Sequence, residues 1–242
     1  MTTSFKNIIE PDFERLYVQL RKKEGRMYTD EELINLPDID DKHQYYKEWQ
    51  LRKLSSQKLT DHLKKKNRPL DILEIGCGNG WLCHRLATIP ESRVIGTDIN
   101  FTEVQQAARV FYFKPNLHFI YGYADSGLFE DKQFDIIIFA ASIQYFNSLH
   151  KILWNAFRLL KSKGSIHIID SPFYTLSEVG SASKRSYMYY EALGFPEMMN
   201  YYFHHKLEDL EHYDHTLLHD PNSLFNKFVK NNNPFPWICI KT

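Results

Sequence analysis

Alternating glycines follow an acidic residue in the stretch D-I-L-E-I-G-C-G-N-G, residues 71–80. The apolar residues of this stretch predict a buried strand, and residues 81–88 predict a helix. A glycine turn between a strand and a helix lets a ligand approach the backbone N–H groups of the helix N-terminus. Glu74 precedes the first glycine, and its carboxylate would repel a pyrophosphate but attract an ammonium group. We therefore expect a nucleotide-like ligand with a positive charge; a tight turn without a ligand is the alternative.

The spacing of these glycines differs from that of a dinucleotide-binding turn. The dinucleotide fingerprint is G-x-G-x-x-G, whereas here Gly80 comes one residue early and Trp81 occupies the place of a small residue. The sequence E-x-G-x-G-x-G resembles motif I of the class I S-adenosylmethionine-dependent methyltransferases. An NAD(P) dehydrogenase is an alternative that the spacing disfavours.

A second acidic residue, Asp98, ends a predicted strand over residues 93–97. It follows the glycine turn by about the interval at which an acid meets ribose hydroxyls in related nucleotide folds. A carboxylate suits that task because it accepts two hydroxyl hydrogen bonds. The alternative is that Asp98 is the N-cap of a helix over residues 101–111.

The resemblance extends to the ends of the next two predicted strands, residues 117–121 and 134–139. After the first of them Tyr123 stands where the family commonly has an acid for the adenine amino group. Three alternatives are open at this position. Asp125 makes the contact with the adenine amino group in place of Tyr123, the Ala124 backbone makes it alone, or Asp125 only caps a turn. The cofactor contacts that the resemblance implies come from Glu74, Gly76, Cys77, Gly78, Asp98, Ile99, Ala124, Asp125 and Ala140.

Gln144 and Tyr145 follow the fourth predicted strand, where related enzymes often carry two histidines beside the methyl acceptor. The absence of histidine at both positions weakens the case for a histidine base on this strand. We expect these two residues to orient the acceptor, and packing of a helix is the alternative for Tyr145.

The residues before the glycine turn, 1–69, predict a helical lid. Residues 13–22 predict a short helix, and Thr29 with Glu32 forms a capping box for a second one, which should stop before Pro37. A long helix is predicted over residues 41–66. Its early residues Tyr46, Trp49 and Arg52 are candidates for closing over the ligand, with Arg52 binding a carboxylate in bidentate fashion; ordinary packing is the alternative.

The C-terminal part predicts an amphipathic helix over residues 149–160, closed by Gly164 as C-cap, and a fifth strand over residues 165–170. An aromatic insertion over about residues 175–196 is expected to form a wall of the acceptor pocket or simply to pack as a helix. The closing strands are predicted at residues 198–204 and 236–241. Between them we expect a helix with three histidines on one face, and we assign no metal site to it: His212, His215 and His219.

Composition narrows the classes of partner. The 242 residues fit one domain, and 30 Lys and Arg balance 30 Asp and Glu, so no net charge favours nucleic acid. Three scattered cysteines indicate reduced thiols in the cytoplasm. We find neither a signal peptide nor an apolar run of membrane-spanning length. The oligomeric state is not predictable from these features.

Together these patterns predict an α/β fold, because strands alternate with helices. The resemblance implies a Rossmann-like, doubly wound, mainly parallel seven-stranded sheet with an antiparallel last strand, occupying residues 70–242. It also implies direct methyl transfer from S-adenosylmethionine, here to a small molecule. The alternatives are a methyltransferase acting on RNA or protein and a non-catalytic module that binds S-adenosylmethionine or S-adenosylhomocysteine.

Overall fold

The computed structural model describes residues 11–241 apart from 125–126, 224–225 and 227–232. Asp125, a predicted adenine contact, therefore lies outside the described residues. The strands are β1 (Asp71–Ile75), β2 (Arg93–Asp98), β3 (Leu117–Tyr121), β4 (Phe134–Ala140), β5 (Leu160–Ile169), β6 (His215–His219) and β7 (Trp237–Lys241). The α-helices are α1 (Pro11–Glu24), α2 (Asp30–Asn35), α3 (Tyr46–Lys64), α4 (Trp81–Leu86), α5 (Phe101–Val110), α6 (Leu149–Leu159) and α7 (Val179–Leu193). Short 3₁₀ helices are η1 (Ile143–Tyr145), η2 (Pro196–Tyr201) and η3 (Leu207–Leu210).

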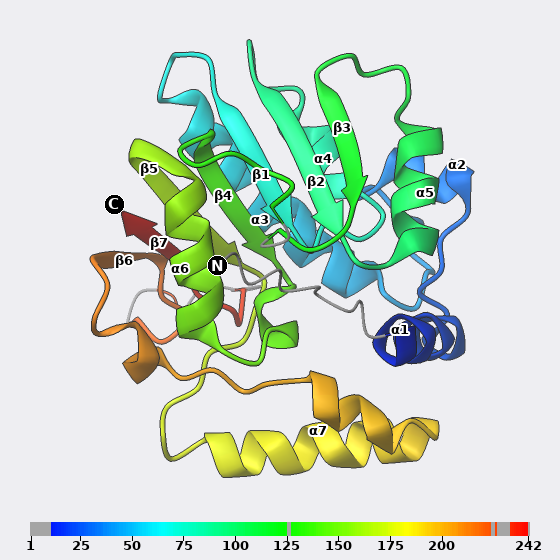
Figure 1. Cartoon of the computed structure of the whole chain (residues 1–242). Helices are drawn as coiled ribbons and strands as arrows, with labels where there is room; N and C mark the ends of the chain where they lie inside the picture. Colours follow the sequence, from blue (N-terminus) through cyan, green and yellow to red (C-terminus); the bar gives the residue numbers. More distant parts are fainter. Residues whose placement is uncertain (1–10, 125–126, 224–225, 227–232, 242) are drawn as a thin grey trace, which may run out of the picture.

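The described strands form one seven-stranded sheet in the order β3-β2-β1-β4-β5-β7-β6 (Figure 1). The pairs from β3 to β5 are parallel, whereas β7 is antiparallel to both β5 and β6. Strand order reverses beside β1, because β2 and β3 lie on one side of it and β4 on the other. The predicted doubly wound sheet with an antiparallel last strand is confirmed.

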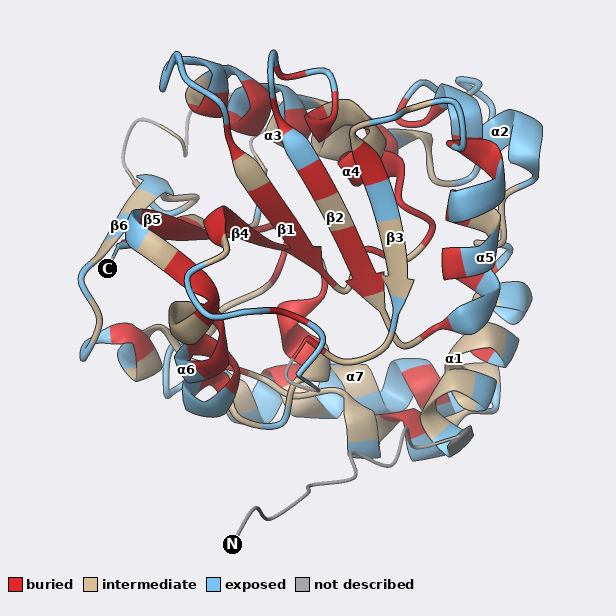
Figure 2. Ribbon diagram, turned by 45° about the horizontal axis from the view of Figure 1, so that its top comes forward, coloured by how far each residue is buried: buried red, intermediate tan, exposed pale blue. Residues whose placement is uncertain are grey.

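Alternate residues of the central strands face two separate cores. Ile72 and Ile136 pack with α3, α4 and α5 on one face of the sheet, whereas Leu73 and Ile137 pack with α6 on the other. This two-sided burial explains why β4 is a nearly continuous apolar run. In Figure 2 the central strands are mainly buried, while the surrounding helices expose their outer faces.

A third, smaller apolar cluster lies beyond the carboxyl ends of the parallel strands, where α1 and α7 lie below the sheet (Figure 1). Its fully buried members are Leu20, Tyr190 and Met198, from α1, α7 and η2. We call α1, α7 and η2 the cap. The cap covers the edge at which ligands bind in open α/β sheets.

The N-terminal segment matches most of its predictions. Thr29 Oγ1 accepts from the backbone N–H of Glu32 at 3.2 Å, and the Glu32 carboxylate accepts from the Thr29 N–H at 2.7 Å, so the capping box is confirmed. Helix α2 ends before Pro37, as predicted, and α3 is shorter than residues 41–66. Leu59 and Leu63 of α3 belong to the sheet core. The division into a lid and a catalytic domain at residue 69 stays a prediction.

Three predictions for the C-terminal half are wrong. Gly164 is not a C-cap, because α6 ends at Leu159 with Leu160 as its cap and the chain enters β5 directly. Residues 198–204 are not a closing strand: Pro196 begins the 3₁₀ helix η2, and Met198 is buried in the cap. The outer neighbour of β7 in the sheet is instead β6. His215 and His219 lie on β6, so the three histidines do not share a helix face.

Candidate active site

The glycine turn has the geometry that its sequence predicts. Gly76, Gly78 and Gly80 adopt positive φ angles of 76°, 52° and 75°. At Gly80 a Cβ atom would lie 2.4 Å from the ring of Phe119 and 3.0 Å from Ala107 Cβ, so only glycine fits between α4 and its neighbours. The backbone of the turn is held to β2, since the Gly76 N–H donates to Thr97 O at 2.8 Å.

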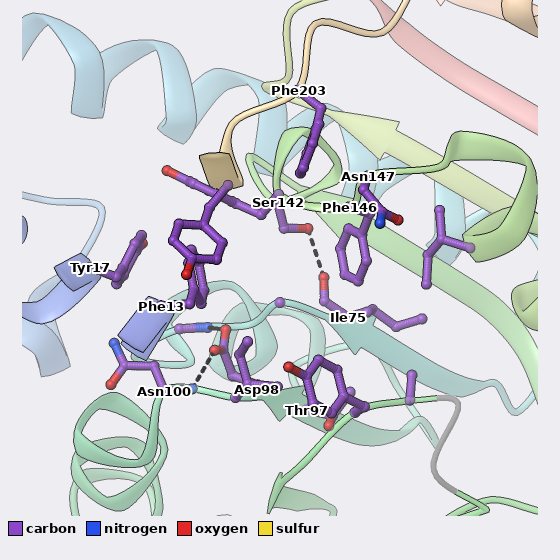
Figure 3. Close-up of a pocket in the computed structure, with 18 of the residues that line it drawn as sticks. Phe13, Tyr17, Ile75, Thr97, Asp98, Asn100, Ser142, Phe146, Asn147 and Phe203 are labelled. Carbon is purple, nitrogen blue, oxygen red and sulfur yellow. Dashed lines mark hydrogen bonds between the residues drawn. The ribbon is translucent and has the colours of Figure 1, made fainter. Parts of the chain in front are cut away.

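Asp98 connects this turn to the end of β2. Its carboxylate accepts from the backbone N–H of Gly78 at 2.7 Å and from that of Asn100 at 2.8 Å. The N-cap of α5 is Asn100, whose side chain accepts from Glu103 N–H. The alternative role of Asp98 as that N-cap is therefore wrong. Burial raises the pKa of Asp98. Figure 3 shows Asp98 at the floor of a cavity, bonded to the neighbouring backbone.

That cavity has a volume of about 510 Å³ and lies at the carboxyl ends of β1, β2, β3 and β4. The predicted cofactor contacts that line it end or follow β1, β2 and β3. Of the predicted cofactor contacts, Gly76, Gly78, Asp98, Ile99 and Ala124 line it. Tyr123, which replaces the acid usual in the family, lines it as well. The structure thus gathers residues from three separate strand ends around one space, as the predicted topology requires.

A second, smaller cavity of about 90 Å³ adjoins the first. The other predicted cofactor residues, Glu74, Cys77 and Ala140, line it together with Trp49 and Arg52 of α3. Four residues line both cavities and mark where they join: Tyr17, Gly76, Gly78 and Ala141. The glycine turn therefore forms a wall common to both.

Three carboxylates surround the glycine turn: those of Glu74 and Glu103 are buried, and that of Asp98 is half-buried. Glu74 is only 2% exposed and accepts from Cys83 Sγ at 2.9 Å; burial is the main cause that raises its pKa to about 8. Burial also raises the pKa of Glu103, to about 7, and Asp98 adds to that shift. Carboxylates that lose water in this way are stabilised in their charged form by a cation. The residues therefore fit a ligand that carries a positive charge.

Of the predicted lid residues, Trp49 and Arg52 line the small cavity, and Tyr46 does not. Arg52 lines that cavity, stacks 5.4 Å from the Trp49 ring and donates to Glu48 at 3.0 Å. Trp49 is 4% exposed, and its Nε1–H donates to the Tyr28 hydroxyl at 2.7 Å. Tyr46 lines neither cavity. Trp49 thus packs in the core and also contributes to the cavity wall, and the closing of this helix over a ligand stays a prediction.

The two predicted acceptor-orienting residues occupy different positions. Tyr145 lines the larger cavity. Gln144 is 6% exposed, lines neither cavity and donates from Nε2 to Ala141 O at 2.7 Å. It therefore holds the turn after β4, where Ala141 has a positive φ of 53°. A direct contact between either residue and an acceptor stays a prediction.

Sequence reasoning missed the contribution of α1. Phe13 and Tyr17 of this helix line the larger cavity, and Tyr17 and Arg21 line the smaller one. The apolar spacing Phe13, Leu16, Tyr17, Leu20 shows a helix with one buried face. Nothing in that spacing shows that the buried face packs against a ligand cavity rather than a core.

The part of the chain that the structure describes meets the requirements of neither a metal site nor a membrane-spanning helix. It contains no group of three or more His, Cys, Asp or Glu side chains arranged to hold a metal ion. It also contains no helix that is both long enough and apolar enough to cross a bilayer.

Residues 64–220 match the family described as "Methyltransferase domain". Among curated proteins, the demethylmenaquinone methyltransferase of Chlorobaculum tepidum is 29% identical over 119 residues, 49% of this chain and 48% of that protein. The malonyl-[acyl-carrier protein] O-methyltransferase of Priestia megaterium is 32% identical over 101 residues, 41% of this chain and 36% of that protein. The chain thus matches half or less of the length of these relatives.

Likeness to a solved structure covers nearly the whole chain. The geranyl diphosphate C-methyltransferase of Streptomyces coelicolor A3(2) superposes with a TM-score of 0.62 at 13% identity, over 98% of each chain. At that identity the likeness establishes the fold alone. Because the family match spans more than half of the chain, the protein belongs to the methyltransferase domain family, and its sheet is the one that the resemblance to the class I S-adenosylmethionine-dependent methyltransferases implies.

Proposed function

We propose that this protein transfers a methyl group from S-adenosylmethionine to a small-molecule acceptor. The observation that supports this most directly is the pair of adjoining cavities that share the glycine turn. One cavity is small and lined by ionic side chains, which suits the amino-acid part of the cofactor. The other is larger and reaches Asp98, which suits the nucleoside and leaves further space beside it.

Each predicted contact has a defined place in this proposal. Glu74 and Arg52 attract the ammonium and carboxylate of the amino-acid part, because both line the small cavity. Asp98 accepts from the ribose hydroxyls, while Ile99 and Ala124 contact the adenine. The cofactor supplies a methyl group already activated by the sulfonium. The protein therefore accelerates transfer chiefly by aligning the acceptor with that methyl group.

A small acceptor is supported by the enclosed aromatic wall of the larger cavity, to which Phe13, Tyr145 and Tyr201 contribute. The names of the two curated relatives specify a demethylmenaquinone and a malonyl group on a carrier protein. The chain's balanced charge gives no support to a nucleic-acid acceptor. The unpaired cysteines Cys77, Cys83 and Cys239 support the predicted cytoplasmic location.

The decisive experiment is calorimetric titration with S-adenosylmethionine. We expect a dissociation constant in the micromolar range, and at least about a hundredfold weaker binding by Asp98→Ala, since charge-assisted hydrogen bonds are lost. Asp131→Ala is the matched control, because Asp131 is exposed and pairs with Arg158. The absence of any heat from the wild-type protein would refute the proposal.

A further inference from the structure

Two tyrosine hydroxyls near the join of the cavities share one partly buried guanidinium, that of Arg21. Arg21 donates from Nη2 to the Tyr17 hydroxyl at 2.9 Å and to the Tyr145 hydroxyl at 3.5 Å. Its Nη1 donates to Glu24 at 3.0 Å, which fixes the guanidinium from the other side. The rings of Tyr17 and Tyr145 meet edge to face with centroids 5.6 Å apart. The two hydroxyls are therefore held close together, although one comes from α1 and the other from η1.

The direction of these bonds determines what the hydroxyls offer to a ligand. A guanidinium only donates, so both tyrosine oxygens accept from Arg21 and each keeps its own proton available for donation. Within the described residues, the hydroxyls of Tyr17 and Tyr145 take part only in the hydrogen bonds from Arg21, and neither hydroxyl donates to a protein atom. Burial raises the pKa of Tyr17 far above its ordinary value, so its proton is retained at neutral pH.

These donors lie where an acceptor has to meet the cofactor. Tyr17 lines both cavities, and Tyr145 lines the larger one. The ring of Phe13 lies 5.8 Å from that of Tyr145 and 5.2 Å from that of Tyr201, and all three rings line the larger cavity. Figure 3 shows Phe13 and Tyr17 on the side of the cavity opposite Phe146. Such aromatic walls favour a flat, conjugated ligand.

The charges around the larger cavity disfavour a cationic acceptor. Asp98 carries the only carboxylate among the described residues that line this cavity. It already accepts from two backbone N–H groups, and the proposed function assigns it to the ribose. The same lining contains a positively charged side chain, that of Lys151, which would repel a cationic acceptor. An anionic oxygen matches the two hydroxyls better than a neutral amine does, because it accepts from both donors at once and gains more from each hydrogen bond.

We propose that the methyl acceptor is a flat, conjugated enol or phenol bound as its anion, with the anionic oxygen accepting from the hydroxyls of Tyr17 and Tyr145. This inference rests on the proposed function. The donors lower the acceptor's own pKa, so a larger fraction is ionised at neutral pH and its proton leaves to water. A bond then forms between the acceptor's carbon or oxygen and the methyl carbon as the carbon–sulfur bond breaks, and the electron pair of the broken bond stays on sulfur.

The test uses 4-nitrophenol as a probe on protein saturated with S-adenosylhomocysteine. The phenolate and the phenol absorb at different wavelengths, so a spectrophotometric titration reports the pKa of the bound probe directly. We expect that pKa to fall by about one unit on binding, because two donors favour the anion. We expect Tyr17→Phe and Tyr145→Phe each to weaken phenolate binding about tenfold, the usual effect of losing a hydrogen bond to a charged group.

Three controls separate anion recognition from general damage. Binding of uncharged 4-nitroaniline should stay within about twofold in both variants, since it lacks the anionic oxygen. Tyr202→Phe is the matched control, because the Tyr202 ring packs edge to face on Tyr145 without lining the cavity. Arg21 acts as a positioning residue, so Arg21→Met should raise the pKa of the bound probe and Arg21→Lys should restore part of the shift.

Two results would overturn the inference while leaving the proposed function intact. One is normal binding of S-adenosylhomocysteine together with no binding of the phenolate. The other is phenolate binding that Tyr17→Phe and Tyr145→Phe leave unchanged relative to Tyr202→Phe. Failure of the wild-type protein to bind S-adenosylhomocysteine would overturn both the inference and the proposed function.

Discussion

The glycine-turn side of the site and the cap side are built in different ways. On the first side, neighbouring strand–turn–helix segments place Gly76, Gly78 and Asp98 through backbone hydrogen bonds. On the cap side, Phe13 and Tyr201 meet only through ring contacts between helices distant in sequence. The sheet cores bury many apolar residues, whereas the cap cluster has three fully buried members, Leu20, Tyr190 and Met198.

This difference separates two tasks. Backbone geometry fixed by the sheet suits a ligand that never changes, namely the cofactor. Side chains supplied by a small peripheral cluster can be exchanged without disturbing the sheet, which suits an acceptor that differs between enzymes. We therefore expect substitutions on the glycine-turn side to affect folding and cofactor binding, and those on the cap side to affect the acceptor.

The largest effect is expected from adding one methyl group to the glycine turn. Gly80→Ala forces a side chain into the left-handed region, at a φ of 75°, and into contact with Phe119. The backbone penalty and the overpacking together should lower the free energy of unfolding by about 3 kcal/mol, measured by urea denaturation.

Gly180→Ala is the matched substitution on the cap side. Gly180 lies in α7 with open space where its Cβ would stand. Alanine is the better helix former, so the free energy of unfolding should rise by about 0.5 kcal/mol. Equal losses of stability in both variants would contradict the distinction between a fixed turn and a tolerant cap.

The contrast also explains how much the sequence could predict. The alternation of strands and helices, the glycine turn and the place of Asp98 at a strand end follow from local signals, because an apolar run, a glycine turn and an acid are each read over a few residues. The capping box at Thr29 is equally local. These features need no knowledge of which distant segments meet. The antiparallel last strand was predicted from the family resemblance.

The cap and the sheet edge were not predictable in the same way. Residues 198–204 are aromatic and apolar enough for a strand, yet Pro196 and the burial of Met198 turn the segment into η2. The edge strand β6 is only partly buried, so its apolar pattern is weak. The helical spacing of Phe13 and Tyr17 shows a buried face without showing its partner. Such contacts depend on tertiary packing rather than on local sequence.

The next largest effect concerns the pH dependence on the glycine-turn side. Burial raises the pKa of Glu74 from 4.5 to about 8 and that of Glu103 to about 7. The folded cofactor-free protein therefore holds protons that the unfolded chain has released, and its stability should fall as pH rises from 4.5 towards 8. A bound cation favours the ionised carboxylates, so S-adenosylmethionine should bind at least about tenfold more tightly at about pH 8.5 than at about pH 6.

Calorimetry in buffers of different ionisation enthalpy would measure the protons released on binding. Glu74→Gln should remove most of the pH dependence, whereas Glu130→Gln, at an exposed position, should leave it unchanged. An affinity that is independent of pH in the wild-type protein would show that these carboxylates do not face the cofactor's charges.

A moderate effect is expected at Arg52, which joins α3 to the small cavity. Arg52→Gln should weaken binding of S-adenosylhomocysteine about fivefold, because a charge-assisted contact to the carboxylate is lost. Binding of methylthioadenosine, which lacks the amino-acid part, should not change. Titration calorimetry with both ligands gives the comparison, and equal losses for both would place Arg52 outside the amino-acid subsite.

The smallest effect on the cofactor is expected at Phe13, in the middle of the aromatic wall. Phe13→Leu keeps an apolar side chain on α1 but removes the flat ring that packs against Tyr145 and Tyr201. Affinity for S-adenosylhomocysteine should stay within about twofold, while 4-nitrophenol should bind about threefold more weakly, since an aromatic pair contributes somewhat less than a charged hydrogen bond. If both ligands lose affinity equally, the two cavities are coupled through α1, and the cap helps to hold the cofactor as well as the acceptor.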